Sequence, residues 1–140
     1  MPFMFSNLRN TTGFGFAVAL GLMSASAVAE IDVSKLPPAS TKTGLTFEKD
    51  IKPLFEKSCF KCHGPEKQKG KLRLDTLEAV NKGGESGKLF EDKNSAKSPL
   101  VHSISGLDED TAMPPKGKGV DALTKEQQGL VRAWIEQGAK

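Results

Sequence analysis

The stretch S-C-F-K-C-H-G-P, residues 58–65, contains both cysteines of the 140-residue chain and one of its two histidines. On a helical backbone, residues three and four positions apart lie on the same face. Cys59, Cys62 and His63 therefore have the spacing that lets three side chains meet one flat ligand from one side. A ligand of that kind would have to sit at the centre of so short a chain, so this stretch decides the fold.

The first 29 residues have the order that is typical of a secretory signal peptide. Arg9 is the only charged residue before a long uncharged run that ends in A-V-A at Ala29. This order predicts cleavage after Ala29, export and a periplasmic location. The alternative is a leader that is retained as a membrane anchor, because the uncharged run is long enough to span a bilayer.

The chain after this leader is long enough for one domain. Residues 30–45 contain two prolines and several serines and threonines, and they are expected to form a flexible lead-in to a domain over residues 46–140. The whole chain carries 20 basic and 17 acidic residues, a net charge of +3, with the two signs interspersed. This balance indicates neither a nucleic-acid partner nor a membrane surface.

Several kinds of chemistry use a C-x-x-C pair in an exported protein. Two cysteines often form a structural disulfide there, but a disulfide needs no adjacent histidine. A thioredoxin-like centre needs strands alternating with helices, and the sequence around Cys59 is not rich in strand formers. A zinc site needs four nitrogen or sulfur ligands, and the chain has only two cysteines and two distant histidines.

C-x-x-C-H is the sequence form of covalent haem attachment. Each thiol bonds one vinyl group of the porphyrin, and the histidine reaches the iron from the same side. Half of the eight phenylalanines lie in the leader, so a domain with little aromatic bulk of its own would gain volume from such a ligand. We therefore predict one haem c on Cys59 and Cys62, with His63 as an axial ligand of the iron.

Met113 is the only methionine outside the leader. It stands in T-A-M-P-P-K-G, where two prolines restrict the backbone and lower the entropy cost of holding the thioether. We predict that Met113 is the second axial ligand, opposite His63. His102 is the rival ligand, and Lys116 and Lys118 are weaker ones.

The haem motif and the methionine together resemble a class I type cytochrome c. More narrowly, the chain resembles the cytochrome c domains common in planctomycetes and verrucomicrobia, over about residues 46–140. The stretches that carry this resemblance are F-E-K-D-I-K-P-L-F-E-K-S-C-F-K-C-H-G-P (47–65), G-K-L-R-L-D-T (70–76), G-G-E-S-G (83–87), S-P-L-V-H-S-I (98–104), M-P-P (113–115) and W-I-E-Q-G-A (134–139).

The resemblance implies an all-α fold of three to five short helices around one covalently bound haem, with the first and last helices crossing. It implies that Cys59 and Cys62 are the thioether positions, that His63 is the proximal ligand and that Met113 is the distal one. The chain departs from the family at Lys71, where such domains often have a second glycine. The close packing expected of that glycine is therefore not implied here.

Local signals predict where the first helices begin and end. Asp50 is expected to cap the first helix and to place Pro53 in its first turn, where a missing N–H costs little. This helix leads into the haem motif. Asp75 is expected to cap a second short helix, which Gly83 ends.

Two more helices are predicted towards the end of the chain. Ser98-Pro99 is a cap and first-turn pair for a helix that ends near Gly106. The last helix begins with a capping box at Thr124 and ends at Gly138. Its apolar stripe is formed by Leu130, Val131, Trp134 and Ile135.

Two further residues are candidates for the surroundings of the haem. The apolar stripe of the last helix is expected to pack against Ile51 and Phe55, which would bring Trp134 near the haem edge. Arg73 could pair with a haem propionate, although an exposed arginine without a partner is an equally good interpretation.

The predicted ligands indicate a function in electron transfer. Two strong axial ligands leave the iron no open position for oxygen or peroxide, and a soft thioether favours the ferrous form. We predict a periplasmic monohaem carrier, not an enzyme, that passes single electrons between a donor protein and an acceptor protein. The alternatives are a haem enzyme or gas sensor with a labile sixth ligand, and a fixed electron-transfer subunit of a periplasmic oxidoreductase.

Overall fold

The computed structural model describes residues 31–140, and the predicted signal peptide lies outside the described residues. Within that range the chain forms five α-helices and no β-strand, only isolated bridges. The predicted all-α fold is confirmed. No helix among these residues combines the length and the apolar character that a membrane span requires.

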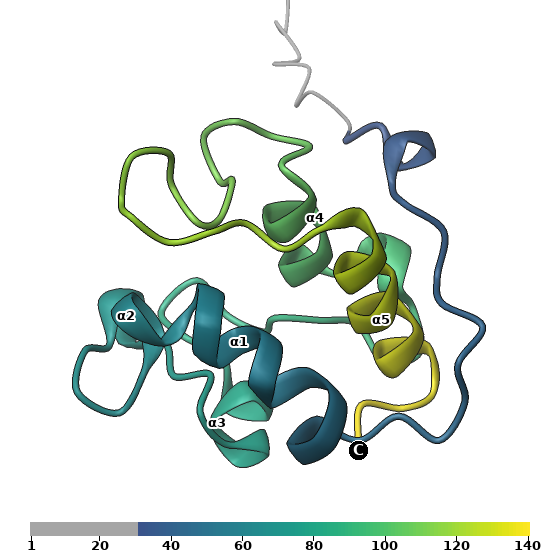
Figure 1. Cartoon of the computed structure of the whole chain (residues 1–140), viewed down its shortest axis with the longest axis horizontal. Coiled ribbons are helices and arrows are strands. Elements are labelled where there is room, and N and C mark those ends of the chain that lie inside the picture. Colours follow the sequence, from purple (N-terminus) through teal and green to yellow (C-terminus); the bar gives the residue numbers. More distant parts are fainter. Residues whose placement is uncertain (1–30) are drawn as a thin grey trace, which may run out of the picture.

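The helices are short and are joined by long loops (Figure 1). A π-helical turn η2 (Phe47–Ile51) leads directly into α1 (Lys52–Ser58), and α2 (Phe60–His63) follows one residue later. The remaining elements are η1 (Val33–Lys35), η3 (Lys69–Lys71), α3 (Leu77–Lys82), η4 (Ser95–Lys97), α4 (Pro99–Ser105) and α5 (Lys125–Glu136).

The first helical segment begins earlier than the sequence suggested. Thr46 occupies the cap of η2, and Asp50 accepts a hydrogen bond from the Thr46 backbone N–H at 2.9 Å instead of capping a helix itself. The Lys52 N–H bonds the Phe47 carbonyl five residues back, in the wider π register. The α-helical register begins only after this turn, so Pro53 still falls in the first turn of α1, as predicted.

The other predicted helices begin and end where the sequence indicates, except that the cap of α3 lies one residue later. Thr76, not Asp75, caps α3 by accepting from the Ala79 N–H at 3.2 Å, because the Asp75 carboxylate is bonded to Arg73. Gly83 ends α3 with φ 74°. Pro99 opens α4 and Gly106 ends it in the left-handed conformation. Both hydrogen bonds of the predicted capping box at Thr124 are present.

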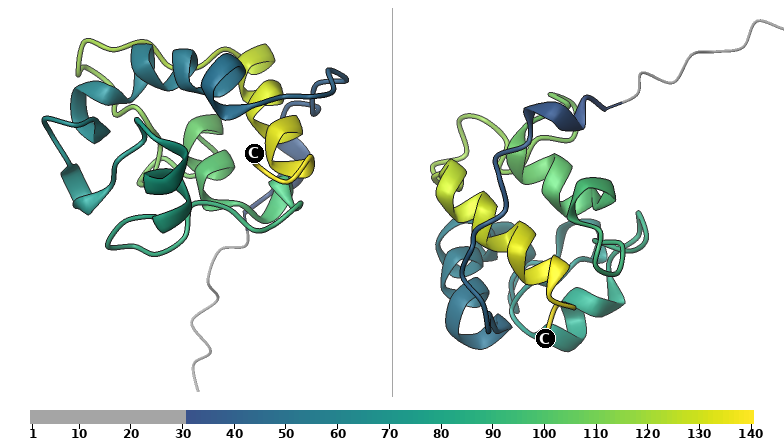
Figure 2. Two further views of the ribbon diagram at one scale, coloured as in Figure 1. Left: turned by 90° about the horizontal axis from the view of Figure 1, so that it is seen from below. Right: turned by 90° about the vertical axis from the view of Figure 1, so that its right-hand side faces the viewer.

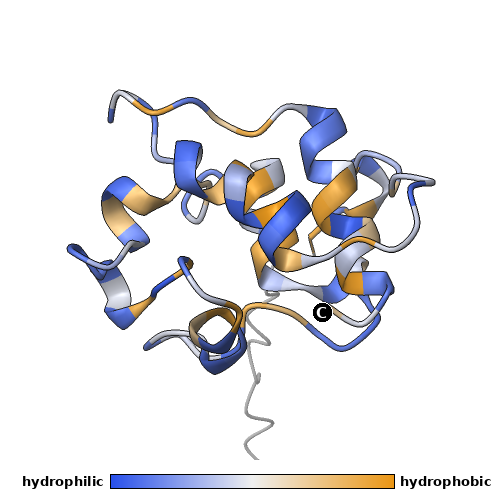
Figure 3. Cartoon of the chain, turned by 60° about the horizontal axis from the view of Figure 1, so that its bottom comes forward, coloured by the Kyte–Doolittle hydropathy of each residue, from blue (hydrophilic) through white to orange (hydrophobic). Residues whose placement is uncertain are grey.

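The core lies where α5 packs on η2 and α4, and the largest buried side chain is Trp134. The Trp134 ring centroid lies 6.0 Å from that of Phe47 and 5.6 Å from that of Phe90. Figure 3 shows hydrophobic residues gathered on the packed helices near the C-terminus. The last helix, α5, therefore meets the first helical segment at its N-terminal turn, η2.

Residues 31–45, expected as a flexible lead-in, run beside α5 in Figure 1 and in the right-hand view of Figure 2. Leu36 and Pro37 are buried. The Ser40 N–H donates to the Gly129 carbonyl at 2.9 Å, and the Arg132 guanidinium donates to the Pro37 carbonyl. The segment is thus held on the domain by apolar contact and by backbone hydrogen bonds.

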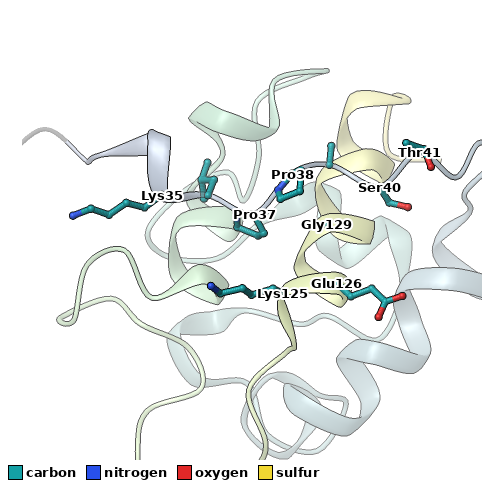
Figure 4. A pocket seen from close by; sticks show the side chains of 10 residues that line it. Lys35, Pro37, Pro38, Ser40, Thr41, Lys125, Glu126 and Gly129 are labelled. Atoms are coloured by element: carbon teal, nitrogen blue, oxygen red, sulfur yellow. The ribbon is translucent and has the colours of Figure 1, made fainter.

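Close contact between this segment and α5 depends on Gly129, shown in Figure 4. A Cβ atom at Gly129 would lie only 2.6 Å from the Pro38 carbonyl oxygen. Beside this contact lies a groove of about 550 Å³, with Lys35 on the segment and Lys125 and Glu126 on the first turn of α5 among its lining residues. Because Gly129 has no side chain, the segment can pack directly against α5.

Candidate functional site

The helices and loops enclose a second, mainly apolar cavity of about 560 Å³. This volume lies in the range of sites that bury an organic cofactor. Five parts of the chain contribute to its lining: residues 58–63, 69–74, 84–89, 99–104 and 110–120. Residues that are far apart in the sequence thus form one site.

The haem motif forms one wall of this cavity. Cys59 ends α1 and caps α2, and its N–H bonds the Phe55 carbonyl at 2.7 Å. The Cys59 carbonyl accepts from the N–H of Cys62 at 3.0 Å and from that of His63 at 2.9 Å. This single helical turn brings all three side chains to the cavity, as the spacing of the motif predicts.

The His63 ring is held by a backbone carbonyl. Its Nδ1 atom lies 3.0 Å from the Lys69 carbonyl oxygen. A carbonyl oxygen can only accept, so Nδ1 carries the proton in this bond, and in the neutral ring Nε2 then has the lone pair. Metal-binding histidines are commonly oriented in this way, because the second nitrogen fixes both the tautomer and the ring plane.

The two cysteines do not have the properties of a redox pair. Both are free thiols in the structure and do not form a disulfide. Burial raises the pKa of the Cys59 thiol to about 12. A thioredoxin-like centre needs a low-pKa first thiol, and residues 31–140 contain no strand to support one. The structure therefore disfavours the disulfide and thioredoxin-like alternatives.

Met113 reaches the same cavity from the loop between α4 and α5. Its backbone N–H donates to the Ser103 carbonyl at 2.9 Å, which ties the loop to α4. Its side chain is 40% exposed, one of the most exposed large apolar side chains among the described residues. Pro114 and Pro115 follow it along the cavity wall. The structure thus brings a thioether and the His63 imidazole to one cavity.

The rival axial ligands are placed less favourably, with one exception. The His102 Nε2 atom lies 2.6 Å from the Ala96 carbonyl oxygen, and His102 is not among the lining residues. Lys116 is nearly fully exposed, 4.0 Å from Glu109, and does not line the cavity. Lys118 does line it.

The structure does not bring Trp134 to the cavity, where we expected it, and it does not bring Arg73 there, which was a candidate for a propionate. Trp134 faces the core on α5, and its indole N–H donates to the Lys140 carbonyl at 3.0 Å. Arg73 donates to both carboxylate oxygens of Asp75, at 2.9 Å and 2.6 Å. The nearby carboxylate therefore accepts from two of the five N–H donors of the guanidinium that was a candidate for a propionate.

Sequence reasoning missed the loop after α3 as part of the site. Gly84, Ser86 and Lys88 belong to the stretch G-G-E-S-G-K, for which no role at the haem was predicted from the sequence, yet they line the cavity. A Cβ at Gly84 would lie 2.7 Å from the Gly70 carbonyl oxygen. Three glycines within five residues were the signal of close backbone packing at this place.

The comparisons with known proteins support the haem interpretation of this site. Residues 59–117 match the family model described as Planctomycete cytochrome C. The match begins at Cys59 and includes Met113, so it contains every part of the cavity wall that carries a predicted ligand. Searches of curated proteins and of solved structures each found no match.

Proposed function

We propose, from the match of residues 59–117 to the family model described as Planctomycete cytochrome C, that this chain is a periplasmic monohaem electron carrier. In this proposal Cys59 and Cys62 form the two thioether links, and His63 and Met113 are the axial ligands. The observation that carries it is that one cavity is lined by both thiols, the imidazole and the thioether.

The donor set fits a haem c. Two free thiols match the two vinyl groups, the Nε2 lone pair of His63 matches one axial position, and the soft sulfur of Met113 suits the other. Among residues 31–140, no three His, Cys, Asp or Glu side chains gather closely enough to hold a metal ion by themselves. When bound, haem c supplies an iron that gains and loses one electron at a time.

The residues of this chain would keep the ligand sphere the same in both oxidation states. The Lys69 carbonyl fixes the plane of the His63 ring, and the bond from the Met113 N–H to Ser103 fixes the backbone of the thioether. A fixed geometry lowers the reorganisation that accompanies electron transfer. The soft thioether of Met113 favours the ferrous form.

The enzyme alternative has less support from this arrangement. Peroxide chemistry at a haem needs an acid–base residue beside the open iron position. His102 was the candidate for this role, and its Nε2 is bonded to the Ala96 carbonyl outside the cavity lining. We therefore place the chain among electron carriers, with a redox protein donor and acceptor as its partners.

Replacement of the predicted sulfur ligand tests this function. Met113→Ala should give a high-spin ferric haem, should allow carbon monoxide to bind the ferrous protein readily and should lower the reduction potential. His102→Ala is the matched control and should leave the low-spin spectrum unchanged. An unchanged spectrum in Met113→Ala, or loss of the low-spin state in His102→Ala, would overturn the ligand assignment.

A further inference from the structure

We propose that the loop Gly83–Lys88 binds the carboxylates of the cofactor, an inference that rests on the haem function proposed above. Haem carries two propionate groups, and Arg73 was a candidate to pair with one of them, beside the equal interpretation of an exposed arginine without a partner. In the structure Arg73 is bonded to Asp75 and does not line the cavity. The carboxylates therefore need other donors.

The charge of the cavity wall suits an anionic ligand. Four lysines line it, and Asp110 is the only acidic residue among the lining residues. They are Lys61, Lys69, Lys88 and Lys118. Lys61 already donates its Nζ to the Lys118 carbonyl at 2.9 Å. A carboxylate that enters the cavity thus meets an excess of positive charge, most of it still available.

The loop after α3 presents several donors that have no acceptor within the described residues, as Lys69, Gly70 and Lys118 also do elsewhere on the cavity wall. Within residues 31–140, the backbone N–H groups of Ser86 and Lys88 donate to no acceptor, and neither do the Ser86 hydroxyl and the Lys88 Nζ. Both residues line the cavity. A carboxylate has two oxygens with about four acceptor sites, so it is bound best where several donors converge.

The loop is held rigidly enough to present these donors. The Gly84 N–H donates to the Gly87 carbonyl at 3.1 Å, and the Gly87 N–H donates back to Gly84 at 3.0 Å. The Glu85 N–H donates to the Gly70 carbonyl at 2.8 Å, which joins the loop to the segment that follows the haem motif. These three bonds involve only neighbouring N–H groups, which leaves those of Ser86 and Lys88 for a ligand.

A nuclear Overhauser experiment on the holoprotein tests the placement directly. The spectrum is recorded on the reduced protein, because a low-spin ferrous haem with His63 and Met113 as ligands is diamagnetic. We expect cross-peaks between the propionate methylene protons and protons of Ser86, Gly87 or Lys88. Cross-peaks to Arg73, or to Lys61 and Lys118 alone, would overturn the proposal.

Variants test the energetic role of the loop. A donor that binds the charged form of a carboxyl group lowers its pKa. In Lys88→Gln and Ser86→Ala, the propionate-linked inflection in the pH dependence of the reduction potential should therefore move upward, by about one pH unit. Lys82→Gln is the matched control, because Lys82 lies on α3 outside the cavity lining and should not shift the inflection.

The two proposals fail in different ways. A protein that emerges from cytochrome c maturation without covalent haem contradicts the proposed function. A protein with covalent haem whose inflection moves equally in Lys88→Gln and in Lys82→Gln contradicts the role of the loop alone. Where the inflection lies outside the pH range in which the protein is stable, the cross-peaks decide.

Discussion

Gly83 is a position where one added methyl group should damage the cavity wall. Its φ of 74° and ψ of −163° lie in a region that is essentially restricted to glycine. An alanine Cβ would also lie 2.2 Å from the Gly87 carbonyl oxygen, a backbone atom that cannot rotate away. Gly83→Ala should therefore open the turn that carries Gly87 and Lys88.

The expected cost has two parts. Forcing a non-glycine residue into this backbone region costs on the order of 1–3 kcal/mol. Ordinary contact begins at 3.4 Å, so the turn must open by about 1 Å, which breaks the two bonds between Gly84 and Gly87. Each hydrogen bond contributes about 1 kcal/mol. We expect Gly83→Ala to lower the free energy of unfolding by about 3–5 kcal/mol.

Urea unfolding of the holoprotein, followed by circular dichroism, measures this loss. The matched control is Gly106→Ala, because Gly106 also has a positive φ, 62°, but no atom lies within 4 Å of its added Cβ. That variant should lose only the cost of the left-handed conformation, roughly 1–2 kcal/mol. Equal losses in the two variants would refute the steric part of the reasoning.

Three further predictions concern other parts of the chain. Lys61→Met removes the hydrogen bond to the Lys118 carbonyl, which joins α2 to the loop between α4 and α5 that carries Met113 (the methionine loop). Imidazole should therefore bind the ferric protein about five- to tenfold more tightly, whereas Lys61→Arg should stay nearer to the parent protein. Unchanged binding would show that this bond does not hold the loop. Lys71 has φ 54°, so Lys71→Gly should raise the free energy of unfolding by about 0.5–1 kcal/mol in urea titrations, and a loss would show that the lysine side chain stabilises this turn. Arg73 holds the pKa of the Asp75 carboxyl below its ordinary value of 3.8, so its stabilisation is present above about pH 4 and is lost as the pH falls through the lowered pKa; Asp75→Asn should flatten the acid part of the stability curve, and parallel curves would contradict this.

Features that depend on neighbouring residues could be predicted from the sequence. The capping box at Thr124 and the stop at Gly83 need only a few consecutive residues, and the structure has both. The spacing of Cys59, Cys62 and His63 likewise fixes their common side through one helical turn. The haem motif could therefore be placed on one wall of a cavity before the fold was known.

Features that depend on distant contacts could not be predicted in this way. Asp50 looked like a cap, but the helical backbone starts four residues earlier with buried Phe47, and the carboxylate bonds the Thr46 N–H instead. The helical period of the last helix predicted that Trp134 is buried. It could not show that Trp134 packs against Phe47 and Phe90 and does not face the cavity.

The loops are the clearest case. The wall formed by residues 84–89 is held by a bond from the Glu85 N–H to the Gly70 carbonyl, and the methionine loop is held by bonds to Ser103 and from Lys61. Each of these hydrogen bonds joins two residues from separate stretches of the sequence, and no local sequence pattern links the two. The structure was needed to show that these loops complete the site, whereas the residue types alone indicated its chemistry.

The intact mass of the protein, expressed with a cytochrome c maturation system and denatured before measurement, tests the central claim most directly. The account predicts a mass increase of one haem that survives denaturation and acid–acetone extraction. Cys59→Ser and Cys62→Ser together should abolish that increase. An unmodified mass in the parent protein, with both thiols still reactive, would contradict the account.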